Sequence, residues 1–183
     1  SWELAKRFDV LDQTAIFCSF SKVTFGGGGL SFAAAGVKLF NLLVRQRASM
    51  IVCSDKVNQM RHLQFLKNKK DILHHMSKHA DLVKPKFEIA FQALDSLGPE
   101  IGSYNKPTGG YFISYNTSKP IAKRVIALCK EAGVLITPAG STYPHFEDPA
   151  DSNIRLAPTF LDLEDLKDAM EVFTTSLQIA IAE

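Results

Sequence analysis

The sequence has little cysteine and no long apolar segment. Its three cysteines, Cys18, Cys53 and Cys129, are widely spaced and form no C-x-x-C pair, which is typical of reduced thiols in a cytoplasmic protein. No apolar run reaches the length of roughly 18 residues that a membrane helix requires. The charged residues at 1–7 are not followed by an apolar segment, so they do not resemble a secretory signal. These absences predict a cytoplasmic protein without a membrane partner.

The sequence also lacks an excess of charge of either sign. It contains 21 Lys and Arg against 19 Asp and Glu, and its pI is about 8.4. A nucleic-acid-binding domain usually has a pI above about 9 with clustered basic residues, so no nucleic-acid partner is predicted. The 183 residues are 46% hydrophobic and 22% charged, which is typical of an ordinary globular protein.

The pattern of apolar residues in the first part of the chain does not predict a complete folding unit. The pattern predicts a buried strand at 14–20, a second short strand at 30–34, and helices near 37–47 and 55–64. One or two strands and two helices cannot close a core of their own. We therefore predict that residues 1–75 are the C-terminal part of a larger α/β domain.

The second part, residues 76–183, is predicted to form a small α+β domain with a linking helix. This helix begins near residue 71, and Pro85 is expected to kink or break it before Gly98 stops it. Further strands are expected at 111–115, 134–137 and 153–157, and further helices at 121–132 and 163–177. Helices that cover a largely antiparallel sheet form a unit of this kind.

Lys22 is the first candidate for chemistry, because it stands where the predicted strand at 14–20 ends. An amine attacks carbonyl groups in its neutral form, and partial burial at a strand end favours that form. The hydroxyls of Ser19 and Ser21 and the amides of the glycine run at 26–29 could hold a phosphate as neutral donors. The alternative is a solvated lysine in a flexible turn.

Arg155 is the second candidate. Alternation along 153–157 places Ile154 and Leu156 in a core and Arg155 on the opposite face. A guanidinium offers two parallel N–H donors that match a carboxylate. The alternative is an exposed arginine in a weak surface ion pair.

Two histidines raise the question of a metal site. His75 and His79 are four residues apart on a predicted helix, a spacing found in some zinc sites. No acidic or cysteine partner stands obviously beside them, so we predict a structural or surface role and no metal.

Four stretches, in order along the chain, resemble aminotransferases of class I/II with fold type I, which depend on pyridoxal 5'-phosphate. These stretches are 19–22 (S-x-S-K), 107–112, 133–140 and 153–158. The amino-acid sequences of three segments, 21–32, 55–62 and 147–155, are similar to those of an unusual aspartate-aminotransferase-like subgroup. The resemblance covers nearly the whole chain. It implies an α/β fold, with the C-terminal end of the large domain followed by an α+β small domain.

The resemblance also implies roles for individual residues. Lys22 would form the Schiff base with pyridoxal 5'-phosphate and carry the proton, and Ser19, Ser21 and Ser31 are candidates to bind the cofactor phosphate. Arg155 would bind the substrate α-carboxylate. The family usually has an arginine on the phosphate shortly after the lysine, and this sequence has none there. Phosphate binding would then depend on neutral donors or on an arginine from elsewhere.

The implied function is transfer of an amino group between an amino acid, such as aspartate, and a 2-oxo acid, by a homodimer of the complete protein. One alternative is another reaction of the same cofactor on this fold, such as β-elimination or decarboxylation. The other is a non-catalytic effector-binding domain of a transcription regulator. In the family, the acid that pairs with the cofactor ring nitrogen lies well upstream of the lysine. We therefore expect this chain to be a fragment that is inactive alone and packs against the missing half or a partner subunit.

Overall fold

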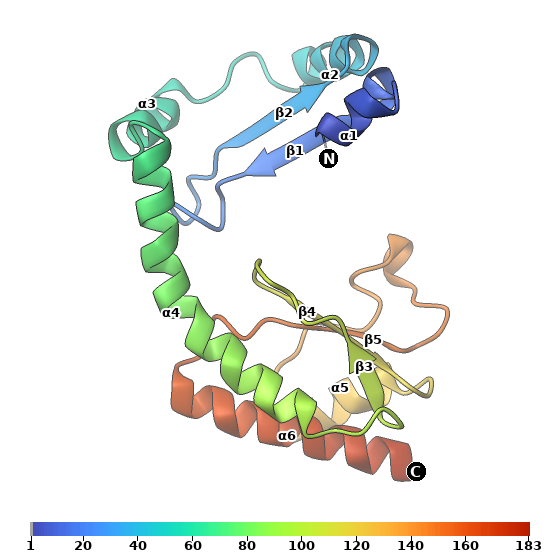
Figure 1. Cartoon of the computed structure of the whole chain (residues 1–183). Coiled ribbons are helices and arrows are strands. Elements are labelled where there is room, and N and C mark those ends of the chain that lie inside the picture. Colours follow the sequence, from blue (N-terminus) through green and yellow to red (C-terminus); the bar gives the residue numbers. More distant parts are fainter. Residues whose placement is uncertain (1) are drawn as a thin grey trace. The chain divides into compact units, whose positions relative to one another are not determined.

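The structure, a computed structural model, describes residues 2–183 and has two compact units (Figure 1). The first unit ends at His79 and the second spans Ala80–Glu183. The division falls inside helix α4 (Lys69–Asp95). All three cysteines are free. Of the helices in residues 2–183, none has both the length and the apolar composition needed to cross a membrane.

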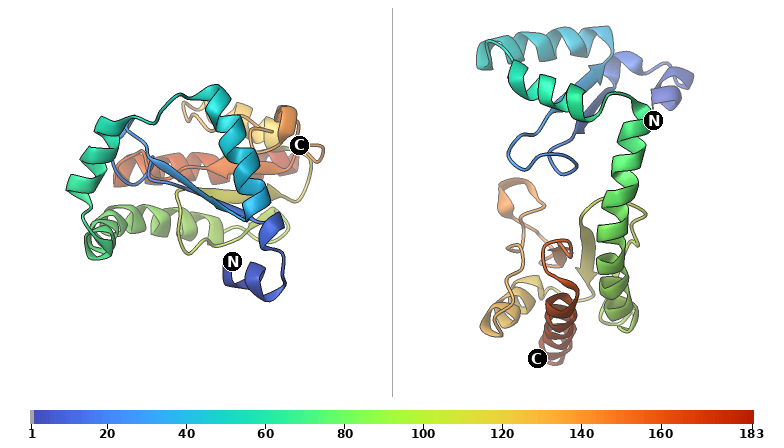
Figure 2. Two further views of the ribbon diagram at one scale, coloured as in Figure 1. Left: turned by 90° about the horizontal axis from the view of Figure 1, so that it is seen from above. Right: turned by 90° about the vertical axis from the view of Figure 1, so that its left-hand side faces the viewer.

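The first unit is built around a two-stranded antiparallel sheet. Strand β1 (Ala15–Ser19) pairs with β2 (Ser31–Ala35), so that Ser19 lies opposite Ser31. The elements around the sheet are helix α1 (Trp2–Arg7), the one-turn helix η1 (Leu11–Gln13), and helices α2 (Val37–Met50) and α3 (Lys56–Phe65). Figure 2 shows the same sheet and helices from two further directions.

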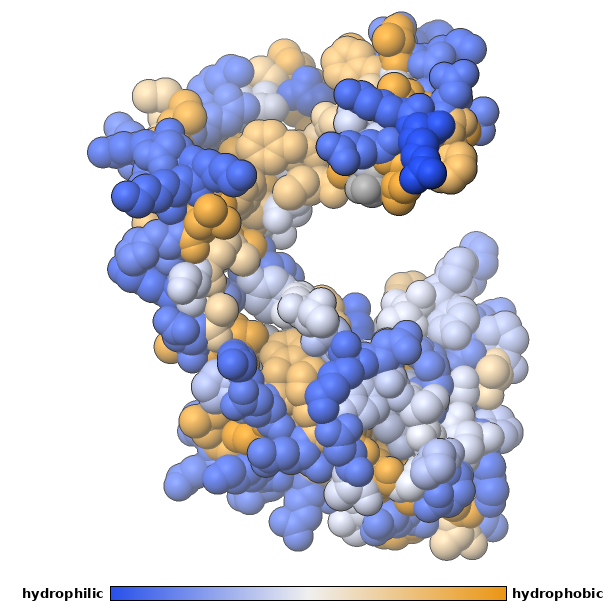
Figure 3. Space-filling view, viewed as in Figure 1, coloured by the Kyte–Doolittle hydropathy of each residue, from blue (hydrophilic) through white to orange (hydrophobic). Residues whose placement is uncertain are grey.

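This first unit buries almost none of its apolar side chains. Phe17 in β1 is 69% exposed, and the only buried residues described in this unit are Ala5, Gly36 and His62. Figure 3 shows apolar side chains at its surface. The strand predicted at 14–20 therefore forms, but its predicted burial is wrong. A two-stranded sheet with a few helices provides no second layer that could cover it.

The helix predictions are correct in position, with one exception at Pro85. Asp55 caps α3 as expected, because its carboxylate accepts the N–H of Asn58 at 3.0 Å. Of the kink or break expected at Pro85, a break does not occur, since α4 runs through this residue as one helix. Proline removes one helical hydrogen bond, but Phe87 and Ala90 on the following turn are buried in the core and stabilise the helix there.

The second unit contains a three-stranded antiparallel sheet with β4 (Ile113–Thr117) in the middle. Strands β3 (Gly102–Tyr104) and β5 (Asn153–Leu156) flank it. Burial alternates along β4, so that Tyr115 is buried and Ser114 is exposed. One face of the sheet packs on α4, α5 (Ala122–Glu131) and α6 (Leu163–Ala182) (Figures 1 and 2). The other face carries polar side chains, among them Ser114 and Asn153.

Two sequence expectations for this sheet are corrected. Residues 134–137 are not a strand, because no neighbouring strand offers them a ladder of hydrogen bonds. The third strand is β3, whose Gly102 and Ser103 give no apolar signal. The helix predicted at 163–177 is α6, and Asp162 caps it as expected by accepting two backbone N–H groups. The largest fully buried side chains are those of Tyr115, Phe173, Ile113, Ile154, Leu177, Val125 and Cys129.

Candidate active site

Lys22 lies in the middle of a tight turn that follows β1. The carbonyl of Phe20 accepts the N–H groups of Val23 and Thr24 at 2.9 and 3.0 Å, which closes the turn. The Lys22 side chain is exposed, so the partial burial expected from the sequence is wrong for the part of the chain described. Within residues 2–183, its amine makes no hydrogen bond and no ion pair. Within the described residues, the position of the Lys22 side chain is therefore determined by the backbone of the turn.

The three serines predicted for the cofactor phosphate lie together beside this turn. The Ser19 hydroxyl donates to the Ser21 hydroxyl at 2.9 Å, and the Ser31 hydroxyl donates to Ser19 at 3.4 Å. Ser31 is brought there by the register of β1 and β2. A Cβ atom at Gly29 would lie 2.8 Å from that of Ser21, so the close approach of the two chains requires glycine. We call Ser19, Ser21 and Ser31 the serine cluster.

Lys22 fits the aldehyde of pyridoxal 5'-phosphate, and the serine cluster fits its phosphate. A lysine amine without a partner can bond to the aldehyde, and hydroxyl donors can bind phosphate oxygens. No arginine of the described chain is bonded to the serine cluster. The donors here are neutral.

Helix α3 forms hydrogen bonds to the loop that carries Lys22 at two places. The His62 ring lies with Nε2 2.8 Å from the Thr24 hydroxyl and with Nδ1 2.9 Å from the Asn58 carbonyl. The Asn58 side-chain amide donates to the Gly29 carbonyl at 3.1 Å. Sequence reasoning did not single out His62 or Asn58. The only signal was the stretch 55–62, which is similar to the aspartate-aminotransferase-like subgroup.

His75 of α4 contacts the same loop. Its Nε2 lies 2.6 Å from the Val23 carbonyl, and its ring meets that of Phe65 edge-on at 5.1 Å. Its ring centroid is 6.3 Å from that of His79. Among residues 2–183, no group of three or more His, Cys, Asp or Glu side chains is arranged to hold a metal ion.

Arg155 lies in the second unit, opposite Ser114 in the sheet and on the face that carries polar side chains. As predicted, Ile154 and Leu156 are buried while Arg155 is only half-buried. Its guanidinium carbon lies 4.8 Å from the centre of the Phe112 ring, and its buried Nε has no hydrogen-bond partner within residues 2–183. A small cavity of about 110 Å³ at this position is lined by residues 134–137 and 155–158, among others. Two of the stretches that carry the family resemblance therefore meet beside Arg155.

A buried polar network holds the start of β5, and sequence reasoning missed it. The Asn153 amide donates to Ser114 and Asn116 at 2.8 Å each. The Asp148 carboxylate accepts backbone N–H groups at Ala150, Ser152 and Asn153, at 3.0, 2.8 and 2.8 Å. Burial raises the pKa of Asp148, but these backbone donors lower it more, so its pKa lies below the usual range.

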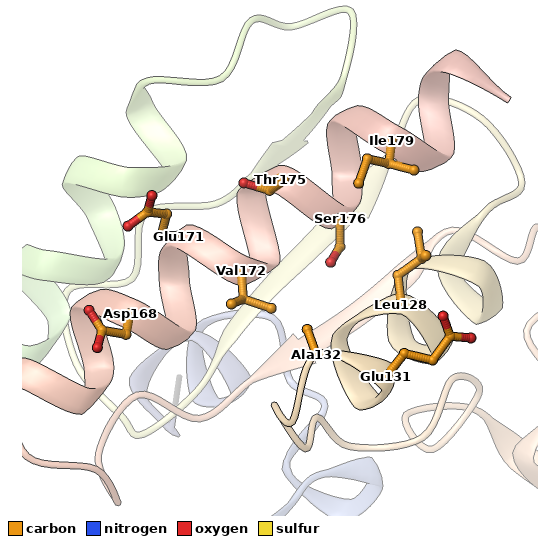
Figure 4. A pocket seen from close by; sticks show the side chains of 9 residues that line it. All are labelled: Leu128, Glu131, Ala132, Asp168, Glu171, Val172, Thr175, Ser176 and Ile179. Carbon is orange, nitrogen blue, oxygen red and sulfur yellow. The ribbon is translucent and has the colours of Figure 1, made fainter.

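A larger groove in the second unit contains none of the predicted site residues. It has a volume of about 480 Å³ and lies between α5 and α6 (Figure 4). Leu128, Val172 and Ile179 give it an apolar floor, and Glu131 and Glu171 are acidic residues in its lining. The candidate chemistry thus belongs to the Lys22 loop in the first unit and to the Arg155 cavity in the second.

Comparison with known proteins places the chain in a family. The profile of the family described as "Aspartate amino-transferase" matches residues 4–183. A protein of Mycolicibacterium smegmatis named "Putative aminotransferase" is 40% identical over 174 residues, which cover 94% of this chain and 41% of that protein. The aspartate aminotransferase of Corynebacterium glutamicum is 37% identical over 169 residues, which cover 91% of this chain and 39% of the relative.

Solved structures have the same fold. The crystal structure of an aspartate transaminase from Corynebacterium glutamicum matches 98% of this chain and 43% of its own, with a TM-score of 0.87 and 33% identity. The α-aminoadipate aminotransferase LysN of Thermus thermophilus, solved with N-(5'-phosphopyridoxyl)-L-leucine, matches 99% of this chain and 46% of its own. Its TM-score is 0.81 at 23% identity, a likeness of fold.

A regulator is also similar to this chain. The HTH-type transcriptional regulator NorG of Staphylococcus aureus is 27% identical over 167 residues, which cover 90% of this chain and 36% of the regulator. The chain spans about two fifths of the length of the curated relatives it matches. The structural neighbours confirm the predicted α/β fold class, and the chain belongs to the aspartate amino-transferase family.

Proposed function

We propose that the full-length protein containing this chain is an aminotransferase that uses pyridoxal 5'-phosphate. It moves an amino group between an amino acid, such as aspartate, and a 2-oxo acid. The observation that carries the proposal is the serine cluster, with hydroxyls 2.9 and 3.4 Å apart, beside the turn that presents Lys22. Membership of the family supports the reaction, and the name of the Corynebacterium glutamicum relative supports aspartate as substrate. The ligand of LysN supports the cofactor.

In this proposal Lys22 has two tasks. Its amine would attach the cofactor covalently, and once free it would move the α-proton of the substrate. The bound cofactor supplies the electron sink for the reaction. Ser19, Ser21 and Ser31 hold its phosphate through neutral donors.

Arg155 binds the α-carboxylate of the substrate in this proposal. Phe112 covers one side of the guanidinium, and the unpaired Nε provides a donor that no described residue uses. Paired N–H donors fix the carboxylate and thereby orient the α C–H bond. We further propose that the full-length protein acts as a cytoplasmic homodimer, with residues 1–75 belonging to its large domain and 76–183 to its small domain.

The proposal is tested by finding the lysine that binds the cofactor. The full-length protein is loaded with pyridoxal 5'-phosphate, reduced with borohydride, digested and mapped by mass spectrometry. We expect the label on Lys22 and its loss, together with turnover, in Lys22→Arg. Lys38→Arg, an exposed lysine of the same unit paired only with Asp12 at 3.7 Å, is the matched control and should keep both. A label on another lysine contradicts the assignment.

The likeness to NorG favours a second candidate, an effector-binding domain of a transcription regulator. Such a domain would attach the cofactor at Lys22 without turnover. Incubation with aspartate and 2-oxoglutarate separates the two, since only an aminotransferase forms glutamate and the new 2-oxo acid. Release of carbon dioxide or ammonia would instead indicate a decarboxylase or a β-eliminating enzyme.

A further inference from the structure

The Lys22 amine forms no hydrogen bond or ion pair within residues 2–183, so its position depends on the backbone of the loop at 20–29. The loop is closed at its start by the hydrogen bonds to the Phe20 carbonyl, and it returns to the sheet where the Phe20 N–H donates to the Leu30 carbonyl at 2.8 Å. Between these points it contains a run of four glycines at 26–29, which lose much conformational freedom when ordered. Such a loop needs contacts from outside to keep one conformation.

Helix α3 supplies two of these contacts. The Nδ1 atom of His62 faces the Asn58 carbonyl, which can only accept, so Nδ1 donates and the ring is held to its own helix. The Nε2 atom then bonds with the Thr24 hydroxyl at 2.8 Å. At the far end of the loop, the Asn58 side-chain amide donates to the Gly29 carbonyl at 3.1 Å. The helix therefore holds both ends of the flexible segment.

The burial of His62 is unusual for this unit. Its side chain is 5% exposed in a unit whose only other buried residues, among those described, are Ala5 and Gly36. Burying an imidazole is costly unless both ring nitrogens are bonded, and here both are. Phe25 of the loop packs edge-on against the ring at 5.1 Å. One of the three buried residues described in this unit thus packs against the loop that carries Lys22.

Helix α4 supplies the third contact. The Nε2 atom of His75 faces the Val23 carbonyl at 2.6 Å and donates to it. Val23 follows Lys22 directly, so this bond restrains the Val23–Thr24 peptide, one residue beyond the lysine. The Phe65 ring lies between the two contacts. Its centroid is 5.3 Å from that of Phe25, which packs on His62, and 5.1 Å from that of His75.

We propose that Asn58, His62 and His75, together the loop clamp, are positioning residues that hold Lys22 ready for attachment to the cofactor. The inference rests on the proposed function. In that step the Lys22 nitrogen bonds to the aldehyde carbon of pyridoxal 5'-phosphate, and the aldehyde oxygen leaves as water. The loop clamp does not touch the amine. It acts by keeping the backbone at 20–29 in the one conformation from which the amine and the serine cluster reach the same ligand.

The variants are chosen to remove hydrogen bonds and keep volume. His62→Phe keeps an aromatic ring against Phe25 and loses both bonds. Thr24→Val removes the partner hydroxyl, and Thr24→Ser restores it. His75→Phe removes the bond to Val23, and His74→Phe, the same change at the exposed neighbouring position on α4, is its control.

Two measurements on the full-length protein separate positioning from a general structural role. The first is amide hydrogen exchange over residues 20–29 in the protein without cofactor. The second is the rate at which added pyridoxal 5'-phosphate becomes trappable by borohydride at Lys22. For His62→Phe, His75→Phe and Thr24→Val we expect exchange confined to 20–29 to accelerate, and attachment to slow, on the order of tenfold or more. Thr24→Ser and His74→Phe should resemble the unaltered protein in both.

Each outcome decides the matter. If the label sits on Lys22 in the unaltered protein but its rate and the loop exchange are the same in all variants, the loop clamp has no positioning role and the proposed function stands. If exchange accelerates throughout the first unit, the residues stabilise the fold at large and the inference is overturned. If the unaltered protein is not labelled at Lys22, the proposed function fails, and the inference about attachment fails with it.

Discussion

The guanidinium of Arg155 stacks on an aromatic ring, but one of its N–H groups has no hydrogen-bond partner among the described residues. The Phe112 ring covers it at 4.8 Å, while the buried Nε has no partner in the chain described. Replacing Arg155 with Lys keeps the charge but loses the planar pair of donors. We expect kcat/KM of the full-length protein to fall about a hundredfold, equivalent to about 2.7 kcal/mol. Arg45→Lys, at an exposed position of α2, is the control, and an unchanged kcat/KM in Arg155→Lys would show that another group binds the carboxylate.

Tyr115 is a second residue whose buried polar atom lacks a partner. Its ring packs edge-on against Phe173 at 5.8 Å, but its hydroxyl finds no hydrogen bond within residues 2–183. Replacing Tyr115 with Phe removes the unpaired hydroxyl and keeps the ring contact. We expect the free energy of unfolding, measured with urea, to stay the same or to rise by about 1 kcal/mol. Tyr143→Phe, at an exposed position, should have no effect; a clear loss of stability in Tyr115→Phe would mean that the hydroxyl is bonded.

The same residue has a consequence at high pH. Burial raises the pKa of Tyr115 to about 12. Between the ordinary value near 10 and this value, the unfolded chain releases the phenolic proton while the folded chain retains it. The unfolded state then binds fewer protons, so the free energy of unfolding falls as pH rises over that interval. Tyr115→Phe should show a smaller fall than the unaltered protein in urea unfolding across this range, and equal falls would contradict the assignment.

At the scale of elements, helix α6 depends on the cap at its first turn. The Asp162 carboxylate accepts the N–H groups of Glu164 and Asp165 at 3.0 and 2.9 Å. Asp162→Ala leaves both unpaired and should lower the free energy of unfolding by about 1 kcal/mol. Asp162→Asn keeps an acceptor oxygen and should lose much less. Equal losses in the two variants would show that the charge at the helix start matters more than the hydrogen bonds.

Helix α4 shows how packing outweighs a local signal. Pro85 removes one helical hydrogen bond and usually breaks a helix interior. The turns after it bury Phe87, Ala90 and Leu94 in the core of the second unit. Burial of these side chains offsets the lost hydrogen bond, and the helix continues.

At the scale of the whole molecule, the apolar surface of the first unit is the dominant feature. In its sheet, Phe17 is 69% exposed and Phe32 is 52% exposed. On the neighbouring helix α2, Val37 is 71% exposed. An exposed apolar sheet of this kind tends to associate with other chains. We expect the isolated 183-residue polypeptide to bind a hydrophobic dye, to bind pyridoxal 5'-phosphate weakly and to show no transamination. The full-length protein is the control, and robust turnover by a preparation whose intact mass matches this chain alone would overturn the expectation.

The sequence by itself determined the features that depend on residues within a turn or two of one another. Asp55 and Asp162 cap helices because their carboxylates reach N–H groups two or three residues ahead. Arg155 faces away from Ile154 and Leu156 because side chains alternate along any strand. The roles predicted for Lys22 and Arg155 came from four sequence motifs that resemble the family. Hydrophobic periodicity indicates helices and strands but not which ligand a side chain binds.

Only the tertiary structure decided which distant residues meet. The register of β1 and β2 brings Ser31 to Ser19, and α3 and α4 bring His62 and His75 to the Lys22 loop. The exposure of β1 was likewise decided at this level, because an apolar run indicates a strand but not whether another layer covers it. These outcomes rest on contacts between residues from about a dozen to more than fifty positions apart, and the local pattern on which sequence reasoning relies does not encode the partner.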